Sequence, residues 1–211
     1  MTKILPCAHI VDDDEAIRDA LQWLFKTRNV TCRVWPSGEA YLEAWQPEWR
    51  GCIVLDIRME KMSGLECFEA LKQRGNRLPV IFITGHGDVP MAVSALKNGA
   101  FHFIEKPFNN HDLVDQVEKA LAYEAEHQRI TADQDALQTR LATLSCRERE
   151  VMALILEGRI NKVIAETLSI SMRTVEAHRS KVFEKLQVRS AVELAQMLAT
   201  LKTESSTIQQ K

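Results

Sequence analysis

Residues 53–59 read IVLDIRM, an apolar run that leads directly into the carboxylate of Asp56. A short apolar run without alternation predicts a strand that is buried on both faces of a sheet. An ionised carboxylate at such a place is costly unless a cation or hydrogen-bond donors balance it. We therefore expect the fold to bring a balancing group to Asp56.

Four further apolar runs resemble this one, and a stretch with helical spacing of apolar residues follows each of them. The predicted strands are 8–11, 32–35, 52–55, 80–84 and 101–105, and the predicted helices are 15–26, 38–45, one from 64, 90–98 and 110–125. Five strand–helix repeats predict an α/β domain with a five-stranded parallel, doubly wound sheet of the flavodoxin-like kind.

The second half of the chain is predicted to be all-α. Residues 124–143 contain no Pro or Gly and are rich in helix formers, which predicts a helical linker. Its apolar spacing leaves open whether it docks on a neighbour or forms a short coiled coil. Four helices are expected beyond it. Those at Ser145-x-x-Glu148 and Ser190-x-x-Glu193 begin with capping boxes, and the other two cover 161–168 and 172–186.

Length and composition fit a globular protein of two domains, with 211 residues of which 45% are hydrophobic and 27% charged. Residues 1–123 carry 14 basic and 17 acidic side chains, whereas residues 141–200 carry 9 and 7. We expect an α/β domain at 1–123, a helical linker at 124–143, a helical domain at 144–202 and a disordered tail at 203–211.

The location of the protein is predicted from three features. The five cysteines are odd in number and lack C-x-x-C spacing, which favours reduced thiols over disulfides or a zinc site. No apolar run approaches the roughly 20 residues that span a bilayer, and acids follow the first residues too closely for a signal peptide. We therefore expect a cytoplasmic protein with no membrane partner.

Polar side chains gather where the predicted strands end, at the edge of a doubly wound sheet where function is concentrated. Asp12 and Asp13 follow the first strand, Asp56 ends the third, Thr84 ends the fourth and Lys106 ends the fifth. A single acid at such a place is often only a helix cap. The whole set instead predicts a Mg²⁺ site, because hard oxygen ligands suit that ion and a cation relieves repulsion between carboxylates.

The stretches HIVDDDEAIRDAL, VLDIRM-x3-SG, VIFITGHGD and GAFHFIEKPF resemble the receiver domain of two-component response regulators, over about residues 4–125. The resemblance implies that a sensor histidine kinase phosphorylates Asp56. It implies a Mg²⁺ site formed by Asp12, Asp13, Asp56 and the backbone carbonyl of Arg58. It also implies a switch and phosphoryl-contact set of Thr84, Phe103, Lys106 and Pro107, with a cis bond before Pro107.

One departure from that family and two other classes of protein bear on this interpretation. Glu60 stands where the family usually has Pro, which puts the rigidity of the loop and the kinetics of phosphorylation in doubt.

A hydrolase of the haloacid dehalogenase type would need a second Asp at position 58, where the chain has Arg58. A DNA-binding protein whose first domain is only a scaffold would not need the set Asp13, Asp56, Thr84 and Lys106. We therefore expect a phosphoacceptor and not an enzyme.

Residues 161–180 have the pattern of two short helices joined by a polar turn. Val175, Val182 and Leu186 share one face of the second helix, so its opposite face is available to a DNA major groove. A charged face on an ordinary bundle would look similar. The predicted DNA contacts are Lys162, Ser171, Arg173, Thr174, Glu176, Ala177, His178, Arg179, Ser180, Lys181 and Lys185. Among them the basic residues suit phosphates, and Glu176 suits a cytosine amino group.

The motifs LS-x-RE-x-EV, NK-x-IA-x-x-L-x-IS-x-x-TVE-x-HR and KL-x-VRS make residues 144–200 similar to the LuxR-type helix-turn-helix domain. Both resemblances together indicate the FixJ/NarL group of regulators, and ITGHGDVPMAV favours its FixJ branch. They imply a transcription factor, with activation more typical than repression. They also imply that phosphorylation favours a homodimer through 91–98, 101–106 and 110–121, which binds an inverted-repeat operator and contacts RNA polymerase.

The four tryptophans lie outside the predicted DNA-binding segment. They are Trp23, Trp35, Trp45 and Trp49, and we expect them to pack in the first domain.

Overall fold

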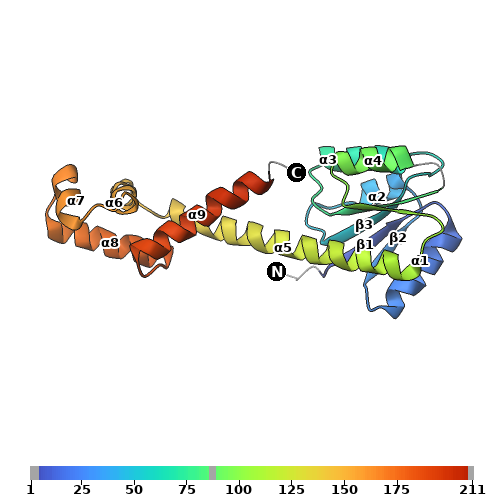
Figure 1. Ribbon diagram of the computed structural model, residues 1–211, viewed down its shortest axis with the longest axis horizontal. Helices are drawn as coiled ribbons and strands as arrows, with labels where there is room; N and C mark the ends of the chain where they lie inside the picture. Colours follow the sequence, from blue (N-terminus) through green and yellow to red (C-terminus); the bar gives the residue numbers. More distant parts are fainter. Residues whose placement is uncertain (1–4, 86–88, 209–211) are drawn as a thin grey trace. The chain divides into compact units, whose positions relative to one another are not determined.

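The computed structural model describes residues 5–85 and 89–208, which divide into two compact units after Gln128. The first unit holds the sheet, with strands β1 Cys7–Val11, β2 Cys32–Trp35, β3 Gly51–Asp56, β4 Val80–Thr84 and β5 His102–Glu105. All pairings are parallel and the strand order is β2-β1-β3-β4-β5. Figure 1 labels β1, β2 and β3 of this sheet among the helices of the first unit. The predicted fold class is confirmed.

Helices connect the strands and cover both faces of the sheet. They are α1 Glu15–Thr27, α2 Gly38–Ala44, α3 Gly64–Gln73, α4 Val89–Lys97 and α5 Asn110–Ala142. The histidine, glycine and aspartate of the predicted ITGHGDVPMAV motif, at positions 86–88, lie outside the described residues.

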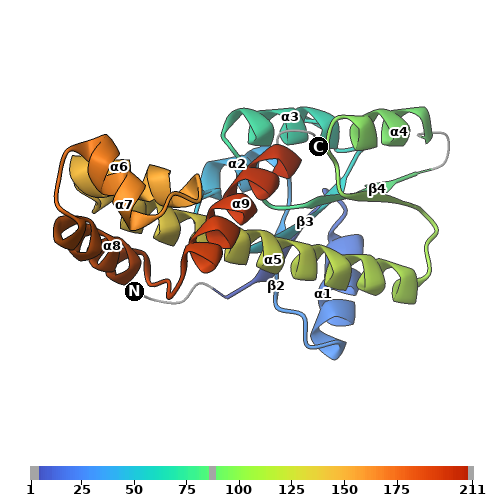
Figure 2. The same ribbon diagram turned by 60° about the vertical axis from the view of Figure 1, so that its left-hand side comes forward.

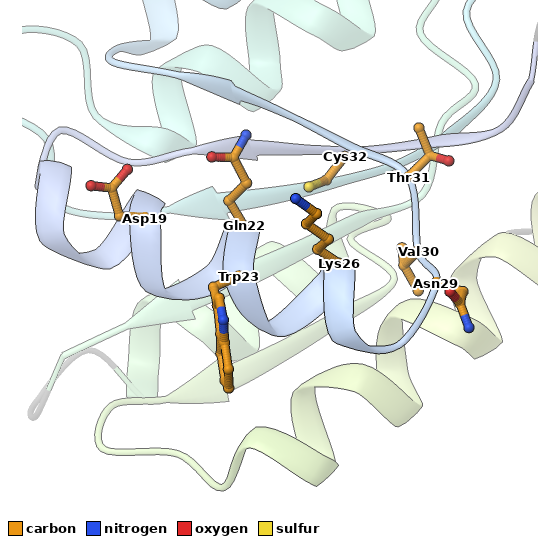
Figure 3. Close-up of a pocket in the computed structure, with 8 residues that line it drawn as sticks. All are labelled: Asp19, Gln22, Trp23, Lys26, Asn29, Val30, Thr31 and Cys32. Carbon is orange, nitrogen blue, oxygen red and sulfur yellow. The ribbon is translucent and has the colours of Figure 1, made fainter.

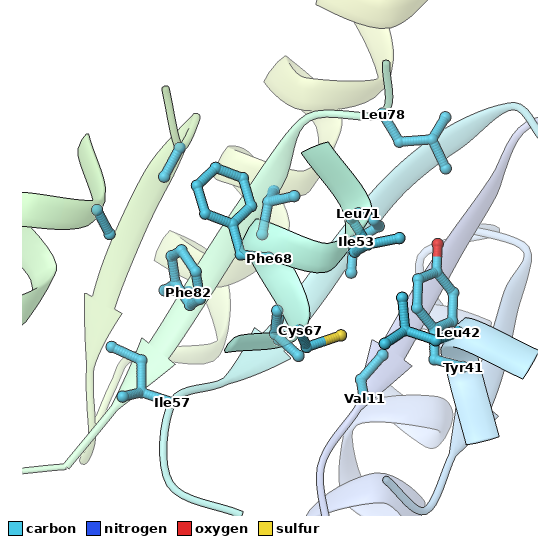
Figure 4. Close-up of a cluster of buried hydrophobic side chains, with 14 of the residues drawn as sticks. Val11, Tyr41, Leu42, Ile53, Ile57, Cys67, Phe68, Leu71, Leu78 and Phe82 are labelled. Atoms are coloured by element: carbon cyan, nitrogen blue, oxygen red, sulfur yellow. The ribbon is translucent and has the colours of Figure 1, made fainter. Parts of the chain in front are cut away.

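Two buried clusters form the core, one on each face of the sheet. On one face, Ile53 and Phe82 pack with Phe68 of α3, in the cluster drawn in Figure 4. On the other face, Val54 packs among buried side chains of α1 and α5. Because neighbouring residues of β3 serve opposite faces, the strand is apolar throughout, and this places Asp56 at the end of a wholly buried segment.

The predicted last helix of the first domain and the predicted linker are one continuous helix, α5. Within the first unit, Arg50 holds this helix through two hydrogen bonds to Glu124, with Nε 2.5 Å from Oε1 and Nη2 3.2 Å from Oε2. The Glu124 carboxylate is buried, so its pairing with Arg50 offsets its desolvation. In the described part of the chain, no helix is both long and apolar enough to cross a membrane.

The second unit holds four further helices, α6 Cys146–Leu156, α7 Asn161–Leu168, α8 Met172–Leu186 and α9 Ala191–Ile208 (Figure 2). Their core contains Ile164 of α7, Val175, Val182 and Leu186 of α8, and Leu194 of α9, all fully buried. The inward face predicted for α8 is confirmed. The capping box at Ser145 and Glu148 is confirmed as well, with both reciprocal hydrogen bonds formed.

Two predictions about α9 are wrong. Ser190 Oγ accepts the N–H of Glu193, but the Glu193 carboxylate accepts the N–H of Arg189, so the reciprocal half of the second capping box is missing. The helix also continues to Ile208, where a disordered tail was expected from residue 203. Neither Pro nor Gly interrupts 191–208, and so nothing in the local sequence stops the helix. Residues 209–211 of the expected tail lie outside the described residues.

Candidate functional site

The strand register brings the predicted acids and base to one edge of the sheet. Val11 pairs with Leu55, so the next residue along each strand, Asp12 and Asp56, lie side by side. Asp56 in turn pairs with Ile83, which places Thr84 just beyond it. Thr84 pairs with the residue before Lys106. Parallel pairing therefore gathers these four side chains from four segments of the chain.

Lys106 supplies the charge that the buried carboxylates require. Its Nζ donates to Asp56 Oδ1 at 2.7 Å and to Asp12 Oδ2 at 3.1 Å. Asp12 and Asp56 are 2% and 5% exposed, so both carboxylates depend on a partner supplied by the protein. The expectation from the run at 53–59 is therefore confirmed, because the fold brings a cation from the end of β5 to Asp56.

Lys106 only partly offsets the cost of burying the charge of Asp56. Burial raises the pKa of Asp56 above its usual range, the hydrogen bond and charge of Lys106 lower it, and the charge of Asp12 raises it again. Burial lowers the pKa of Lys106, but its hydrogen bond to Asp56 and the charges of both carboxylates raise it by more. The ammonium is thus firmly protonated, while the carboxylate of Asp56 carries an unrelieved cost of burial.

The three consecutive aspartates after β1 have three different partners. Asp12 Oδ1 accepts the N–H of Asp14, while its backbone carbonyl accepts Arg18 Nη1 at 2.8 Å. Asp14 caps α1 by accepting the N–H groups of its first turn. Asp13 is exposed, and its Oδ2 accepts the N–H of Glu60 at 2.8 Å. Only Asp14 is therefore used as a helix cap.

The loop after Asp56 is held close to it. The N–H of Gly64 donates to the carbonyl of Ile57 at 2.9 Å, and a Cβ at Gly64 would lie 2.1 Å from the carbonyl oxygen of Asp56. A side chain does not fit there without moving the backbone of Asp56. Glu60 adds a hydrogen bond that a proline at this position would lack, because proline has no N–H. The departure at Glu60 thus gives Asp13 a partner.

The remaining predicted switch residues lie on β4 and β5. Thr84 is buried, and its hydroxyl donates to the carbonyl of Gly85 at 3.3 Å. Phe103 is half-buried and packs against the cluster that contains Phe82. The bond between Lys106 and Pro107 is cis, as predicted. Their roles in a switch stay predictions.

The donors fit Mg²⁺ in their chemistry. Asp12, Asp13, Asp56 and the carbonyl of Arg58 are all hard oxygen ligands. In the structure the ammonium of Lys106 lies between the carboxylates of Asp12 and Asp56 and neutralises part of their charge, as a metal ion would. Among the residues that the structure describes, no three Asp, Glu, His or Cys side chains are grouped closely enough to hold a metal ion.

A groove of about 700 Å³ between α1 and the start of β2 lies apart from this site (Figure 3). Trp23 lines it and is 68% exposed, so the prediction that all four tryptophans pack is wrong for this one. Trp23 follows the spacing of exposed positions on α1, between buried Leu21 and Leu24. Trp35, Trp45 and Trp49 do pack, against the cluster in Figure 4.

The second candidate site is the pair α7 and α8. Ser169, in the left-handed conformation, ends α7, and Ser171 caps α8 by accepting the N–H of Thr174 at 3.1 Å. This short turn brings α8 onto α7 and leaves one face of α8 outside the unit. Of the predicted DNA contacts, the exposed ones are Lys162, Ser171, Arg173, Thr174, Glu176, Ala177, Ser180 and Lys181.

Three predicted DNA contacts are partly buried within the unit. Nδ1 of His178 is buried and has no hydrogen-bond partner among the described residues. The guanidinium of Arg179, which helical spacing assigned to the outward face, lies 5.5 Å from the centre of the Phe183 ring. Lys185 forms an ion pair with Glu148, with Nζ 2.6 Å from Oε2.

The Lys185–Glu148 pair joins α8 to the start of α6. Glu148 is 4% exposed, and its Oε2 also accepts the N–H of Ser145. These hydrogen bonds, with that of Lys185 the largest, lower the pKa of Glu148 to about 2. Lys185 Nζ also donates to the carbonyl of Thr143 at 3.0 Å. The sequence pattern missed this pair because its members are far apart in the chain.

Comparisons with known proteins match both halves of the chain. Residues 8–118 match the response regulator receiver domain, and residues 142–198 match the bacterial regulatory proteins of the luxR family. The chain is 49% identical over 191 residues to the C4-dicarboxylate transport transcriptional regulatory protein DctR of Rhodobacter capsulatus, covering 90% of this chain and 97% of that one. It is 42% identical to the transcriptional regulatory protein FixJ of Rhizobium meliloti, covering 90% and 93%.

Two solved structures are similar over nearly the whole chain. The response regulator StyR has a TM-score of 0.86 at 38% identity, covering 92% of this chain and 98% of that one. Full-length FixJ from B. japonicum has a TM-score of 0.60 at 34% identity, covering 95% and 99%.

The fold and the two sites define a signal receiver joined to a helix-turn-helix DNA-binding domain. The chain belongs to the response regulators with a LuxR-type DNA-binding domain and is similar to FixJ among them. It is a transcription factor of the two-component type, a class in which phosphorylation drives activation.

Proposed function

We propose that Asp56 is the phosphoacceptor of this regulator and that its phosphorylation promotes DNA binding through α8. The single observation that carries the proposal is the gathering of Asp12, Asp56, Thr84 and Lys106 at one edge of the sheet, with Lys106 bonded to both carboxylates. An acid held this way is ionised, positioned and next to a cation, as a carboxylate nucleophile must be.

The transfer takes a phosphoryl group from a phosphohistidine of a sensor histidine kinase. A carboxylate oxygen of Asp56 attacks phosphorus, a P–O bond forms as the P–N bond breaks, and the imidazole leaves and takes its proton from solvent. Lys106 donates to the oxygens on which charge gathers. This step belongs to the switch, and we propose no turnover of other substrates and therefore no enzyme activity.

We propose that Mg²⁺ assists this step and that Asp12, Asp13, Asp56 and the backbone carbonyl of Arg58 hold it. When bound, it would supply positive charge to the phosphoryl oxygens. To hold the ion, Asp13 would give up the hydrogen bond that its carboxylate accepts from the N–H of Glu60.

The phosphorylated receiver is proposed to form a homodimer. Thr84 and Phe103 would turn toward the phosphoryl group, with Pro107 shaping the segment beside Lys106. The proposed surface comprises 91–98, 101–106 and 110–121. Met91, Val93 and Leu96 support it, because these large apolar side chains of α4 are 36–42% exposed.

The dimer is proposed to bind an inverted-repeat operator in double-stranded DNA, with half-sites about one helical turn apart. The exposed Lys162, Arg173 and Lys181 would contact phosphates, and Glu176 with its exposed neighbours on α8 would contact base edges. Contact with RNA polymerase and activation of transcription complete the proposal. We propose that the protein acts in the cytoplasm, where it would meet the histidine kinase, the operator and RNA polymerase.

The test compares wild type with Asp56→Asn in the presence of Mg²⁺ and acetyl phosphate. DNA fragments are first selected from a random pool by the treated wild type, and affinities are then measured by fluorescence anisotropy. We expect the donor to raise the affinity of wild type at least ten-fold and to shift it toward a dimer in gel filtration. Asp56→Asn should show neither change. An equal response of both proteins would overturn the assignment of Asp56.

A further inference from the structure

The C-terminal turn of α8 carries a lysine that was grouped with phosphate-contacting residues and that the structure uses differently. Lys185 Nζ lies 2.6 Å from Glu148 Oε2 and 3.0 Å from the carbonyl oxygen of Thr143. Two of the three donors of its ammonium are thus engaged within the second unit. A phosphate would have to displace partners that the domain itself needs.

The carboxylate in this pair cannot easily release its lysine. The Glu148 side chain is 5% exposed, against 35% for Lys185. Without the ammonium, a buried charge would keep only the hydrogen bonds of its capping box, and breaking a buried pair in this way is strongly destabilising. The pair therefore favours the ion-paired position of Lys185 over an extended one.

The pair joins three segments that the helix-turn-helix must hold in place. Thr143 follows the last residue of α5, Glu148 lies in the first turn of α6, and Lys185 lies in the last turn of α8. Lys185 is also flanked by Val182 and Leu186, whose side chains are fully buried in the core of the unit. A single ammonium thus fastens the end of α8 to the junction of α5 and α6.

Arg147 adds a second contact of the same kind. Its Nη2 donates to the carbonyl oxygen of Leu168, the last residue of α7. The first turn of α6 therefore holds α7 through Arg147 and α8 through Glu148. Both helices of the motif are oriented by one short stretch of chain.

We infer that Lys185 is a positioning residue that orients the recognition helix α8 through Glu148 and Thr143, and that it is not a phosphate contact. The inference rests on the proposed DNA binding by α8. Lys181 provides the contrast, because it lies one turn earlier on the same helix and is exposed.

The salt dependence of DNA binding separates the two roles. Each phosphate contact releases a counterion, so its loss lowers the slope of log K against log salt by about 0.9. A positioning residue affects the affinity through the geometry of the whole helix, and its loss leaves the number of phosphate contacts unchanged. We therefore expect Lys181→Met to reduce the slope by about 0.9 and Lys185→Met to leave it unchanged.

The experiment uses the full chain treated with Mg²⁺ and acetyl phosphate, and the DNA fragment selected by wild type as described above. Lys185→Met should lower the affinity at least ten-fold at every salt concentration. Glu148→Gln should lower it to a similar extent, although Glu148 is buried and carries the wrong charge to bind a phosphate. The double variant should bind no more weakly than Lys185→Met alone, because both changes break the same pair.

Three results would separate the possibilities. A slope reduced by Lys185→Met as much as by Lys181→Met, with Glu148→Gln binding like wild type, would overturn the inference. If Lys185→Met does not fold, Glu148→Gln alone decides, because the positioning role requires its affinity to fall and a phosphate contact does not. A random pool from which the treated wild type selects no fragment would instead overturn the proposed function itself.

Discussion

The two units of the chain each contain a lysine paired with a buried carboxylate, and the two pairs have nearly the same geometry. The Lys106–Asp56 distance is 2.7 Å with side chains 24% and 7% exposed, and the Lys185–Glu148 distance is 2.6 Å with side chains 35% and 5% exposed. The carboxylates nevertheless titrate in opposite directions, because the pKa of Asp56 is raised and that of Glu148 is lowered to about 2.

The difference comes from the neighbours of each carboxylate. Asp56 shares its lysine with a second buried acid, Asp12, and its burial outweighs the hydrogen bonds that it accepts. In the part of the chain that the structure describes, no second acid pairs with Lys185, and Glu148 accepts the N–H of Ser145 in addition to the bond from Lys185. Lysine pairing alone therefore does not decide what a buried acid does. The receiver leaves its acid under-stabilised and ready for chemistry, whereas the helix-turn-helix unit satisfies its acid and uses it to hold helices.

The largest effect on stability is expected from Lys106→Met. This change leaves Asp12 and Asp56 buried side by side without a cation, so the receiver should lose about 3–5 kcal/mol at pH 7. Urea unfolding followed by tryptophan fluorescence measures this directly, because all four tryptophans lie in residues 1–128. Mg²⁺ should restore part of the loss by replacing the missing cation.

Lys72→Met is the matched control for that experiment. Lys72 pairs with Glu69 on the surface of α3, where both side chains are at least 42% exposed. Its loss should change the stability by less than about 1 kcal/mol. Equal losses in the two variants would mean that Lys106 does not balance the buried acids.

Glu148→Gln should cost the second unit about 2 kcal/mol, since Lys185 loses its charged partner and keeps only a neutral amide oxygen, whereas Gln can still complete the capping box. Hydrogen exchange of the amides of α6 and α8, measured by mass spectrometry, reports this loss. Glu150→Gln is the control, because Glu150 lies two residues further on α6 and is half-exposed in its pair with Arg147. Similar exchange in both variants would contradict a special role of Glu148.

The pH dependence of stability should have opposite signs in the two units. The folded pKa of Glu148, about 2, lies below its unfolded value of 4.5, so its contribution is present above pH 4.5 and is lost as the pH falls toward 2. The folded pKa of Asp56 lies above its unfolded value of 3.8, so stability falls as the pH rises from 3.8 through the folded value, and the full cost is present above it.

Two variants isolate these contributions. Asp56→Asn should make the receiver more stable than wild type at pH 7, with a difference that shrinks as the pH falls. Glu148→Gln should make the second unit less stable at pH 7, with a difference that shrinks below pH 4.5. Fluorescence and hydrogen exchange follow the two units separately. If both variants changed stability at pH 7 in the same direction, the two carboxylates would not differ in the way described here.

The smallest effect is expected from Asp133→Ala. Asp133 pairs with Arg129 along α5, and the two side chains are 70% and 63% exposed. Such exposed pairs contribute about 0.3–0.5 kcal/mol on a helix, so the urea midpoint should hardly move. A larger shift would mean that burial is not what distinguishes the two lysine pairs.

Local sequence rules were enough to predict most of this fold and the meeting of charged residues at the edge of the sheet. The apolar runs predicted all five strands, and parallel pairing then required Asp12, Asp56 and Lys106 to meet. The capping box at Ser145 was also predictable, because its members are three residues apart.

The features that sequence reasoning missed depend on tertiary contacts. Lys185 and Glu148 are 37 residues apart in the chain, and neither carries a local signal of the other. The contact between Arg179 and Phe183 is different, because the two residues are one turn apart on α8 and their spacing could have predicted it. The hydrogen bond from Glu60 to Asp13 likewise depends on how two loops meet at the sheet edge.

The assignment of different roles to the two lysine pairs is tested most directly by locating the phosphoryl group. Wild type, Asp56→Asn and Glu148→Gln are incubated with Mg²⁺ and acetyl phosphate, and intact masses and acid-quenched peptides are measured. We expect one phosphoryl group on the peptide that contains Asp56, in wild type and in Glu148→Gln, and none in Asp56→Asn. A phosphoryl group retained by Asp56→Asn, or absent from wild type at every Mg²⁺ concentration, would contradict the account.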